Sequence, residues 1–311
     1  MRFSAALIFV TSTFAAVAFA ADAQLLKLIP GEAQVIAGVD AGRVKGSPFG
    51  QYLLAQLSAH EPQLESLETL TGFNPRRDVS EIVLAASGPS RKKGVVLLRG
   101  AFDKGKILGM LSARGQAPAM YQGVEILANP QGGEAMALVD STLLMLGDTG
   151  EVKAALDRRG QAGGLEAGLA AKIDQLSAAH DVWMVSKAPV SEFAGVVEDR
   201  HASGMLKGDL WKKIRQASGG IKFGSMVTMA AEAEAQTAQD AAALADVARF
   251  FVGMFQLQSP QNVPEPIAKM FRNASVTSAG NTVKVNFEMP SVELETLVQG
   301  LTRRQGRRAG L

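Results

Sequence analysis

The stretch from Glu81 to Leu156 determines the fold, and it reads EIVLAASGPSRKKGVVLLRGAFDKGKILGMLSARGQAPAMYQGVEILANPQGGEAMALVDSTLLMLGDTGEVKAAL. Short apolar runs alternate with turn-forming segments rich in Gly, Pro, Asp and Ser. The pattern predicts, in chain order, strands at Ile82–Ser87 and Val95–Gly100, a helix at Lys104–Leu111, strands at Gly123–Ala128, Ala135–Val139 and Thr142–Leu146, and a helix from Gly150. Short hairpin connections of this kind predict a mainly antiparallel sheet.

A looser version of this order recurs towards the C-terminus. It begins with an apolar strand at Asp181–Ser186, which resembles an earlier strand at Val35–Val39. The later pattern predicts a helix around Leu210–Ala217, a turn at Gly219-Gly220, a strand or strand pair at Ile221–Ala233, a helix at Thr237–Phe255, a hairpin at Ala274–Ser278 and Val283–Met289, and a last helix after Pro290. We therefore predict an α+β fold with two similar halves, at about 35–157 and 182–302. Each half is expected to hold a mainly antiparallel sheet with helices packed on one face.

The N-terminus has the parts of a secretory signal peptide. Arg2 supplies the positive charge, Ala5–Ala18 is apolar, and Ala18-Phe19-Ala20 places small residues where signal peptidase reads them. We expect cleavage after Ala20, with Ala21-Asp22-Ala23 as a later alternative and an uncleaved anchor as the other interpretation. The resulting domain assignment is a signal peptide at 1–20, a first α+β repeat at 21–165, a second at 166–302 and a basic tail at 303–311.

Composition excludes several classes of protein. The 311-residue chain is 47% hydrophobic and 20% charged, so it can form a sizeable core. It contains no cysteine, which excludes disulfides, zinc–thiolate sites, a cysteine nucleophile and a lipid-bearing cysteine. The formal charge of +2 lacks the basic excess of a general nucleic-acid binder. We expect no nucleic acid, no cofactor and, after signal cleavage, no transmembrane segment.

Two short motifs resemble those of a known group. Pro30-Gly31-Glu32-Ala33 precedes the first strand, and Gly72-Phe73-Asn74-Pro75-Arg76-Arg77-Asp78 precedes the second. Together with the duplicated layout they resemble a loose group of bacterial exported α+β proteins of unknown function. Those proteins share a Pro-x-(acid)-Ala opening and a Gly-(apolar)-(Asp/Asn)-Pro-x-x-Asp segment. The resemblance implies a periplasmic or extracellular setting, and it supplies no enzymatic residues.

No motif in the sequence favours catalysis. The three histidines, His60, His180 and His201, lack the spacing that would place two imidazoles on one helical face. Glu232 and Glu234 lie two apart and would point the same way from a strand, an arrangement that the paired carboxylates of a hydrolase would use. Acidic residues are also favoured next to a helix start, so a structural interpretation is preferred.

Two sets of residues are candidates for binding. Met226, Met229, Met254 and Met270 could line an adaptable apolar groove, although methionine is more often core filler. Arg303, Arg304, Arg307 and Arg308 follow the last predicted helix as a basic tail. That tail could contact an anionic surface such as lipid headgroups, or could simply be a frayed solubilising end.

These observations favour an exported, non-enzymatic binding or interaction protein. Its partner would be an unknown envelope protein or an apolar ligand. The first alternative is a carrier of an apolar or lipid ligand in a cavity between sheet and helices. The second is a hydrolase without a recognisable motif.

Overall fold

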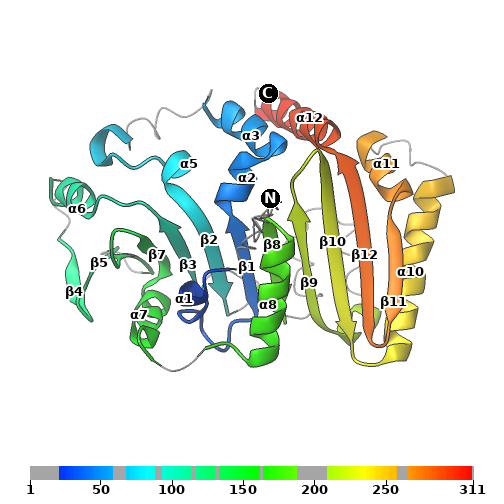
Figure 1. The fold of residues 1–311 in the computed structure, drawn as a ribbon, viewed down its shortest axis with the longest axis horizontal. Helices are drawn as coiled ribbons and strands as arrows, with labels where there is room; N and C mark the ends of the chain where they lie inside the picture. Colours follow the sequence, from blue (N-terminus) through cyan, green and yellow to red (C-terminus); the bar gives the residue numbers. More distant parts are fainter. Residues whose placement is uncertain are drawn as a thin grey trace, which may run out of the picture.

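The structure is a computed structural model, shown in Figure 1. It describes residues 21–58, 68–87, 93–113, 117–129, 133–161, 164–187, 209–257 and 265–309, with side chains described up to residue 300. The predicted signal peptide, His60 and His201 lie outside the described residues.

Every paired strand in the described part of the chain belongs to one antiparallel sheet. The strands are β1 (Val35–Asp40), β2 (Val79–Ala86), β3 (Gly94–Gly100), β4 (Ala119–Tyr121), β5 (Val124–Ala128), β6 (Glu134–Leu138), β7 (Leu143–Asp148), β8 (Val182–Ser186), β9 (Ile214–Lys222), β10 (Met226–Ala235), β11 (Ser275–Ala279) and β12 (Thr282–Pro290). Their order across the sheet is β11-β12-β10-β9-β8-β1-β2-β3-β7-β6-β5-β4. The α+β class with mainly antiparallel strands, predicted from the sequence, is confirmed, and the strands of both predicted halves join in one sheet.

The two predicted halves meet at the centre of this sheet. Strand β1 pairs directly with β8, for example Ile36 opposite Val185 and Ala37 opposite Met184. Outward from this pair the order is β1-β2-β3-β7-β6 on one side and β8-β9-β10-β12-β11 on the other. A duplication would produce such corresponding orders, but the superposition of the halves stays a prediction.

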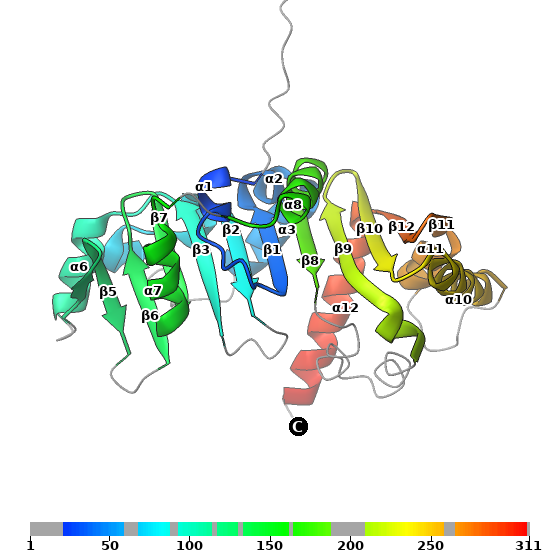
Figure 2. The same ribbon diagram turned by 90° about the horizontal axis from the view of Figure 1, so that it is seen from below.

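Helices lie on both sides of the sheet. They are α1 (Ala23–Leu26), α2 (Ala41–Gly46), α3 (Pro48–Ser58), α5 (Pro75–Asp78), α6 (Lys104–Ala113), α7 (Thr149–Arg158), α8 (Ala167–Ala179), α10 (Ala238–Leu257), α11 (Glu265–Arg272) and α12 (Ser291–Ala309), with a 3₁₀ helix η2 (Asp209–Lys213). Figure 2 shows α1 and α8 on one side of the sheet and α12 projecting from the other.

The main core fills the side of the sheet under α1, α7 and α8, which we call the covered face. Its strand residues come from β1 and β8 as well as β2, β3, β5, β6 and β7, so both predicted halves share it. Leu97, Met145, Val152 and Ile173 are all fully buried there. Two smaller clusters lie under η2 and α10 and under α6.

The predicted turn at Gly219-Gly220 is wrong. Both glycines lie inside β9, where Gly220 pairs with Trp183 and Gly219 with Met184. A Cβ on Gly220 would lie 2.4 Å from Cγ of His180, and one on Gly219 would lie 2.4 Å from the carbonyl oxygen of Ala230. The glycines therefore allow close contacts across the strand and do not reverse the chain.

The predicted helix at 210–217 is also wrong, because η2 ends at Lys213 and β9 begins at Ile214. Five short elements, α1, α2, α5, β4 and α11, were not expected from the sequence. The four arginines of the predicted tail belong to α12, which continues to Ala309. Their side chains lie outside the described part.

Candidate binding surface

The two faces of the central sheet differ in how completely they are covered. On the covered face, Ile36, Val83, Val95 and Val185 are at most 1% exposed. On the opposite face, which we call the open face, Leu146 is 36% and Met184 41% exposed, although both are central-strand residues. Apolar side chains in a sheet interior are normally packed, so this difference identifies the open face as a candidate binding surface.

A continuous line of apolar residues crosses the open face. Each member is directly opposite the next in the strand register, and none is fully buried. This central row consists of Leu127, Met136, Leu146, Val96, Leu84, Ala37, Met184, Gly219 and Ala231. Neighbouring strands are about 4.8 Å apart, so the row is roughly 38 Å long.

The row opens into two adjoining grooves. One has a volume of about 670 Å³ and includes Leu84 and Val96 in its wall. The other, of about 590 Å³, includes Leu127, Met136 and Leu146. Glu134 lines both grooves, so an apolar wall has a polar group at its edge, as is common in sites for small molecules.

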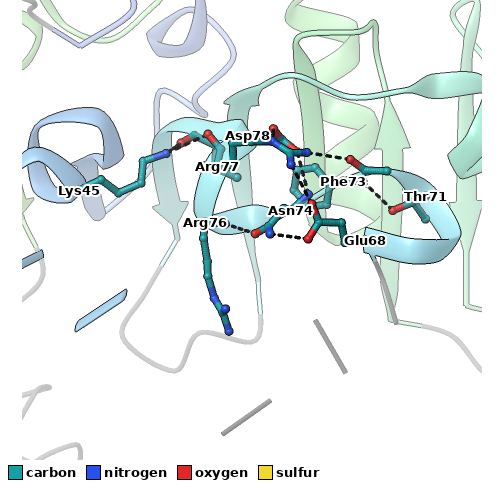
Figure 3. A network of polar contacts seen from close by, with 10 residues as sticks. Lys45, Glu68, Thr71, Phe73, Asn74, Arg76, Arg77 and Asp78 are labelled. Carbon is teal, nitrogen blue, oxygen red and sulfur yellow. Dashed lines mark hydrogen bonds and ion pairs between the residues drawn. The ribbon is translucent and has the colours of Figure 1, made fainter. Parts of the chain in front are cut away.

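The motif at 72–78 forms a polar network that positions the start of β2 (Figure 3). Asn74 Oδ1 accepts a hydrogen bond from the Arg76 amide at 3.0 Å, which caps α5, and Asn74 Nδ2 donates to Glu68 at 2.7 Å. Asp78 accepts from the Asn74 amide at 2.7 Å and from Arg77 Nε at 2.7 Å. The Arg77 guanidinium holds the pKa of Asp78 below its ordinary value, against a smaller effect of burial.

This network serves the fold more than it serves a ligand. Lys45 Nζ donates to the carbonyls of Arg77 and Val79, at 3.2 and 2.6 Å, and so ties α2 to the beginning of β2. Gly72 has φ of +69°, which directs the chain into the motif. The Phe73 ring packs against the tilted Phe102 ring, with the two ring centroids 5.2 Å apart. The motif at 72–78 therefore fixes the entry of the chain into β2.

The four methionines predicted to line a groove are not gathered into one. Met226 and Met229 are three residues apart on β10, so their side chains point to opposite faces. Met254 lies on α10 and is 41% exposed, while Met270 lies on α11. None of them lines either groove of the central row.

The other predicted candidates have structural partners. Glu232 lies 2.6 Å from Lys172 Nζ and 3.1 Å from Lys284 Nζ, and Glu234 accepts a hydrogen bond from Asn281 at 3.2 Å. His180 ends α8, with Nδ1 3.1 Å from the carbonyl oxygen of Leu176. Within the described residues, no three His, Cys, Asp or Glu side chains are placed to hold a metal ion.

Sequence reasoning missed the central row, although one signal was present. The run Ile82–Ala86 is apolar at successive positions, and so is Val95–Leu98, which places apolar side chains on both faces of β2 and β3. Helices were expected on one face of each sheet, but the sequence does not reveal which face the helices leave open. No helix in the described part of the chain is both long and apolar enough to cross a membrane.

Comparison with known proteins identifies the fold alone. Neither a protein-family model nor a curated protein matches the chain. Two solved structures, crystal forms III and IV of TP0453, superpose on it with TM-scores of 0.54 and 0.55. They are 9% and 8% identical in sequence, and each comparison covers 88% of this chain and at least 95% of that one. The chain thus shares an overall architecture with TP0453.

Proposed function

We propose that the protein is exported and acts without catalysis, by binding the apolar chain of an amphiphilic ligand along the central row. The observation that carries this proposal is the exposure of Leu146 and Met184 in the middle of a twelve-stranded sheet. Leaving such side chains in water costs free energy, roughly 25 cal/mol for each Å² of apolar surface. The two exposed side chains within the row are therefore expected to have a partner.

The dimensions favour a narrow ligand. The grooves of about 590 and 670 Å³ lie within the usual range of small-molecule sites, roughly 300–1,000 Å³. They are open along the sheet and are not enclosed between sheet and helices. The carrier hypothesis therefore applies with an open groove in place of the enclosed cavity. An apolar chain could lie across the strands while its polar end remains in water.

Export is supported by the signal-like sequence ending at Ala20 and by the resemblance to bacterial exported proteins. The four arginines near the end of α12 could attract an anionic headgroup or an anionic membrane surface. An envelope protein that inserts an apolar segment into the row is the competing occupant.

A fluorescent apolar probe tests the proposal. Purified protein is titrated with 1-N-phenylnaphthylamine, and palmitate is used to displace the probe. Met184→Lys places a charge in the row and should weaken probe binding at least tenfold. Met254→Lys is a matched control, because Met254 has the same 41% exposure on α10, and it should bind like the wild type.

The outcomes separate the alternatives, provided that both variants keep the wild-type circular dichroism spectrum. Weaker binding by Met184→Lys alone supports the row. Weaker binding by Met254→Lys alone would favour the methionine groove predicted from the sequence. Absence of saturable probe binding to the wild type would refute an apolar-chain ligand.

A further inference from the structure

A cavity of about 580 Å³ with charged residues in its wall lies on the covered face, where the two halves meet, and Ala21 is part of its wall. Ala21 is only 8% exposed, and its backbone nitrogen donates to Oγ of Ser177 in α8 at 2.9 Å. Ser177 is itself 2% exposed. The residue directly after the predicted cleavage position is thus held inside the protein, in contact with the second half.

Carboxylates outnumber cations around this nitrogen. Asp22 from α1, Asp40 from β1 and Glu81 from β2 line the cavity, together with Arg43 from α2. Arg99 from β3 pairs with Asp22, so three carboxylates face two guanidinium groups.

The two arginines are engaged away from Glu81. Arg43 Nε lies 2.7 Å from Asp40 and 3.5 Å from the buried Asp181 at the start of β8. Its Nη2 donates to the Ser177 and His180 carbonyls at the end of α8, at 2.5 and 3.1 Å. Glu81 receives a backbone hydrogen bond from Asp22 at 3.2 Å and has no ion pair in the described part of the chain.

We infer that this cavity is the binding site for the protein's own mature N-terminus, in which the α-ammonium of Ala21 is held by Ser177 and paired with Glu81. Cleavage after Ala20 converts an amide with one N–H into an ammonium with three donors at the same position. Consecutive residues advance by at most about 3.6 Å, so the Ala21 nitrogen lies within about 7 Å of Glu81 Oε1. The freed ammonium can rotate towards that carboxylate.

The electrostatics of the unprocessed chain agree with this geometry. Burial raises the pKa of the Glu81 carboxyl above its ordinary value, and the Asp22 and Asp40 carboxylates raise it further, against the hydrogen bond from the Asp22 amide and the weaker attraction of the Arg99 charge. A cation beside Glu81 would relieve this unfavourable environment. Processing would therefore stabilise the folded protein by adding the missing positive charge.

A two-by-two comparison tests the pairing. A chain beginning at Ala21 is prepared with a free or an acetylated α-amine, each with Glu81 and with Glu81→Gln, and urea unfolding midpoints are measured at pH 7. The free-amine protein should have the higher midpoint, and the difference should disappear in the Glu81→Gln background. Pairing with Glu81 should raise the pKa of the Ala21 α-amine by roughly one unit and so reduce its unprotonated, reactive fraction at pH 7. Its reaction with an amine-selective reagent at pH 7 should therefore be about tenfold slower than in an unfolded peptide.

Equal midpoints for the free and acetylated proteins would overturn the inference. So would a difference of the same size in Glu81→Gln, because the ammonium would then have another partner. Neither measurement involves an apolar ligand, so the inference and the proposed function stand or fall separately. The inference requires cleavage of the chain after Ala20, and N-terminal sequencing checks that cleavage independently.

Discussion

Replacing Gly220 by alanine gives a sharp test of the strand assignment for β9. A Cβ at this position would lie 2.4, 2.6 and 2.8 Å from Cγ, Cβ and Nδ1 of His180, all shorter than real contacts. The His180 ring cannot move away easily, because its Nδ1 contacts the Leu176 carbonyl at 3.1 Å. Overpacking of this kind costs about 1–3 kcal/mol.

Alanine also has a favourable effect of its own. It reduces the entropy of the unfolded chain, which stabilises the protein by about 0.4–1 kcal/mol where the backbone conformation suits alanine. Gly220 is not among the described residues with positive φ, so alanine is compatible with its backbone. Subtracting this gain from the overpacking cost gives a net loss between about 0 and 2.6 kcal/mol for Gly220→Ala.

The sign should reverse when the contact is removed. His180→Gly deletes the atoms that would clash, including Cβ, which His180→Ala would retain. In the His180→Gly background, Gly220→Ala should stabilise the protein by the entropic term, about 0.4–1 kcal/mol. Urea unfolding of the wild type, both single variants and the double variant gives the coupling free energy directly.

The predicted turn at Gly219-Gly220 leads to a different result. A glycine required for a turn would resist alanine in both backgrounds, because the penalty would come from the backbone and not from His180. Equal losses in the wild-type and His180→Gly proteins would therefore refute the strand assignment. Proteins that retain the wild-type circular dichroism spectrum are needed for the comparison.

Three further measurements follow from the structure. Phe251 on α10 is half-buried, so Phe251→Ala should lower the free energy of unfolding by about 1–3 kcal/mol, less than the ~3–5 kcal/mol expected for a fully buried phenylalanine. Urea titration measures this loss, and a larger one would contradict the partial burial. Partial burial raises the pKa of Glu232, but hydrogen bonds from Lys172 and Lys284 outweigh it and leave the pKa below its ordinary value. The resulting stabilisation is present above the unfolded pKa of about 4.3 and is lost as the pH falls through the folded pKa. Glu232→Gln should therefore flatten the acid side of the plot of Tm against pH. An unaltered plot would count against the ion pairs. Native protein from the cell envelope should begin at Ala21, and N-terminal sequencing that returned Met1 would exclude processing.

Apart from β4, the elements between Glu81 and Leu156 could be predicted because their boundaries depend on local chemistry. Asp148 accepts hydrogen bonds from the Gly150 and Glu151 amides, at 2.9 and 3.4 Å, so it marks the start of α7 in the sequence as well as in the structure. Such local requirements remain visible in the sequence whatever the distant packing.

The failures depend on contacts between distant residues. Gly220 resembles a turn residue until His180, forty residues earlier, is placed against it. Leu146 and Met184 resemble core residues, since nothing local distinguishes an apolar side chain under a helix from one on the open face. The candidate surface was therefore hidden from the sequence, because it results from where the helices pack.

The different positions of α7 and α12 follow from the side chains beneath them. Both helices come directly after the second strand of a hairpin, but only α7 packs on the covered face, through Val152, Ala155 and Leu156. The corresponding surface of β10 and β12 is polar, with Glu232 and Glu234 on β10 and with Lys284, Asn286 and Glu288 exposed on β12. A helix placed there would remove these charged side chains from water, at a cost that hydrophobic contacts could not recover. Helix α12 instead contacts α3 and α11, and it projects from the side of the sheet that carries the central row. The polar surface of the second half thus places the arginine-rich end of α12 on the side where an amphiphilic ligand would bind.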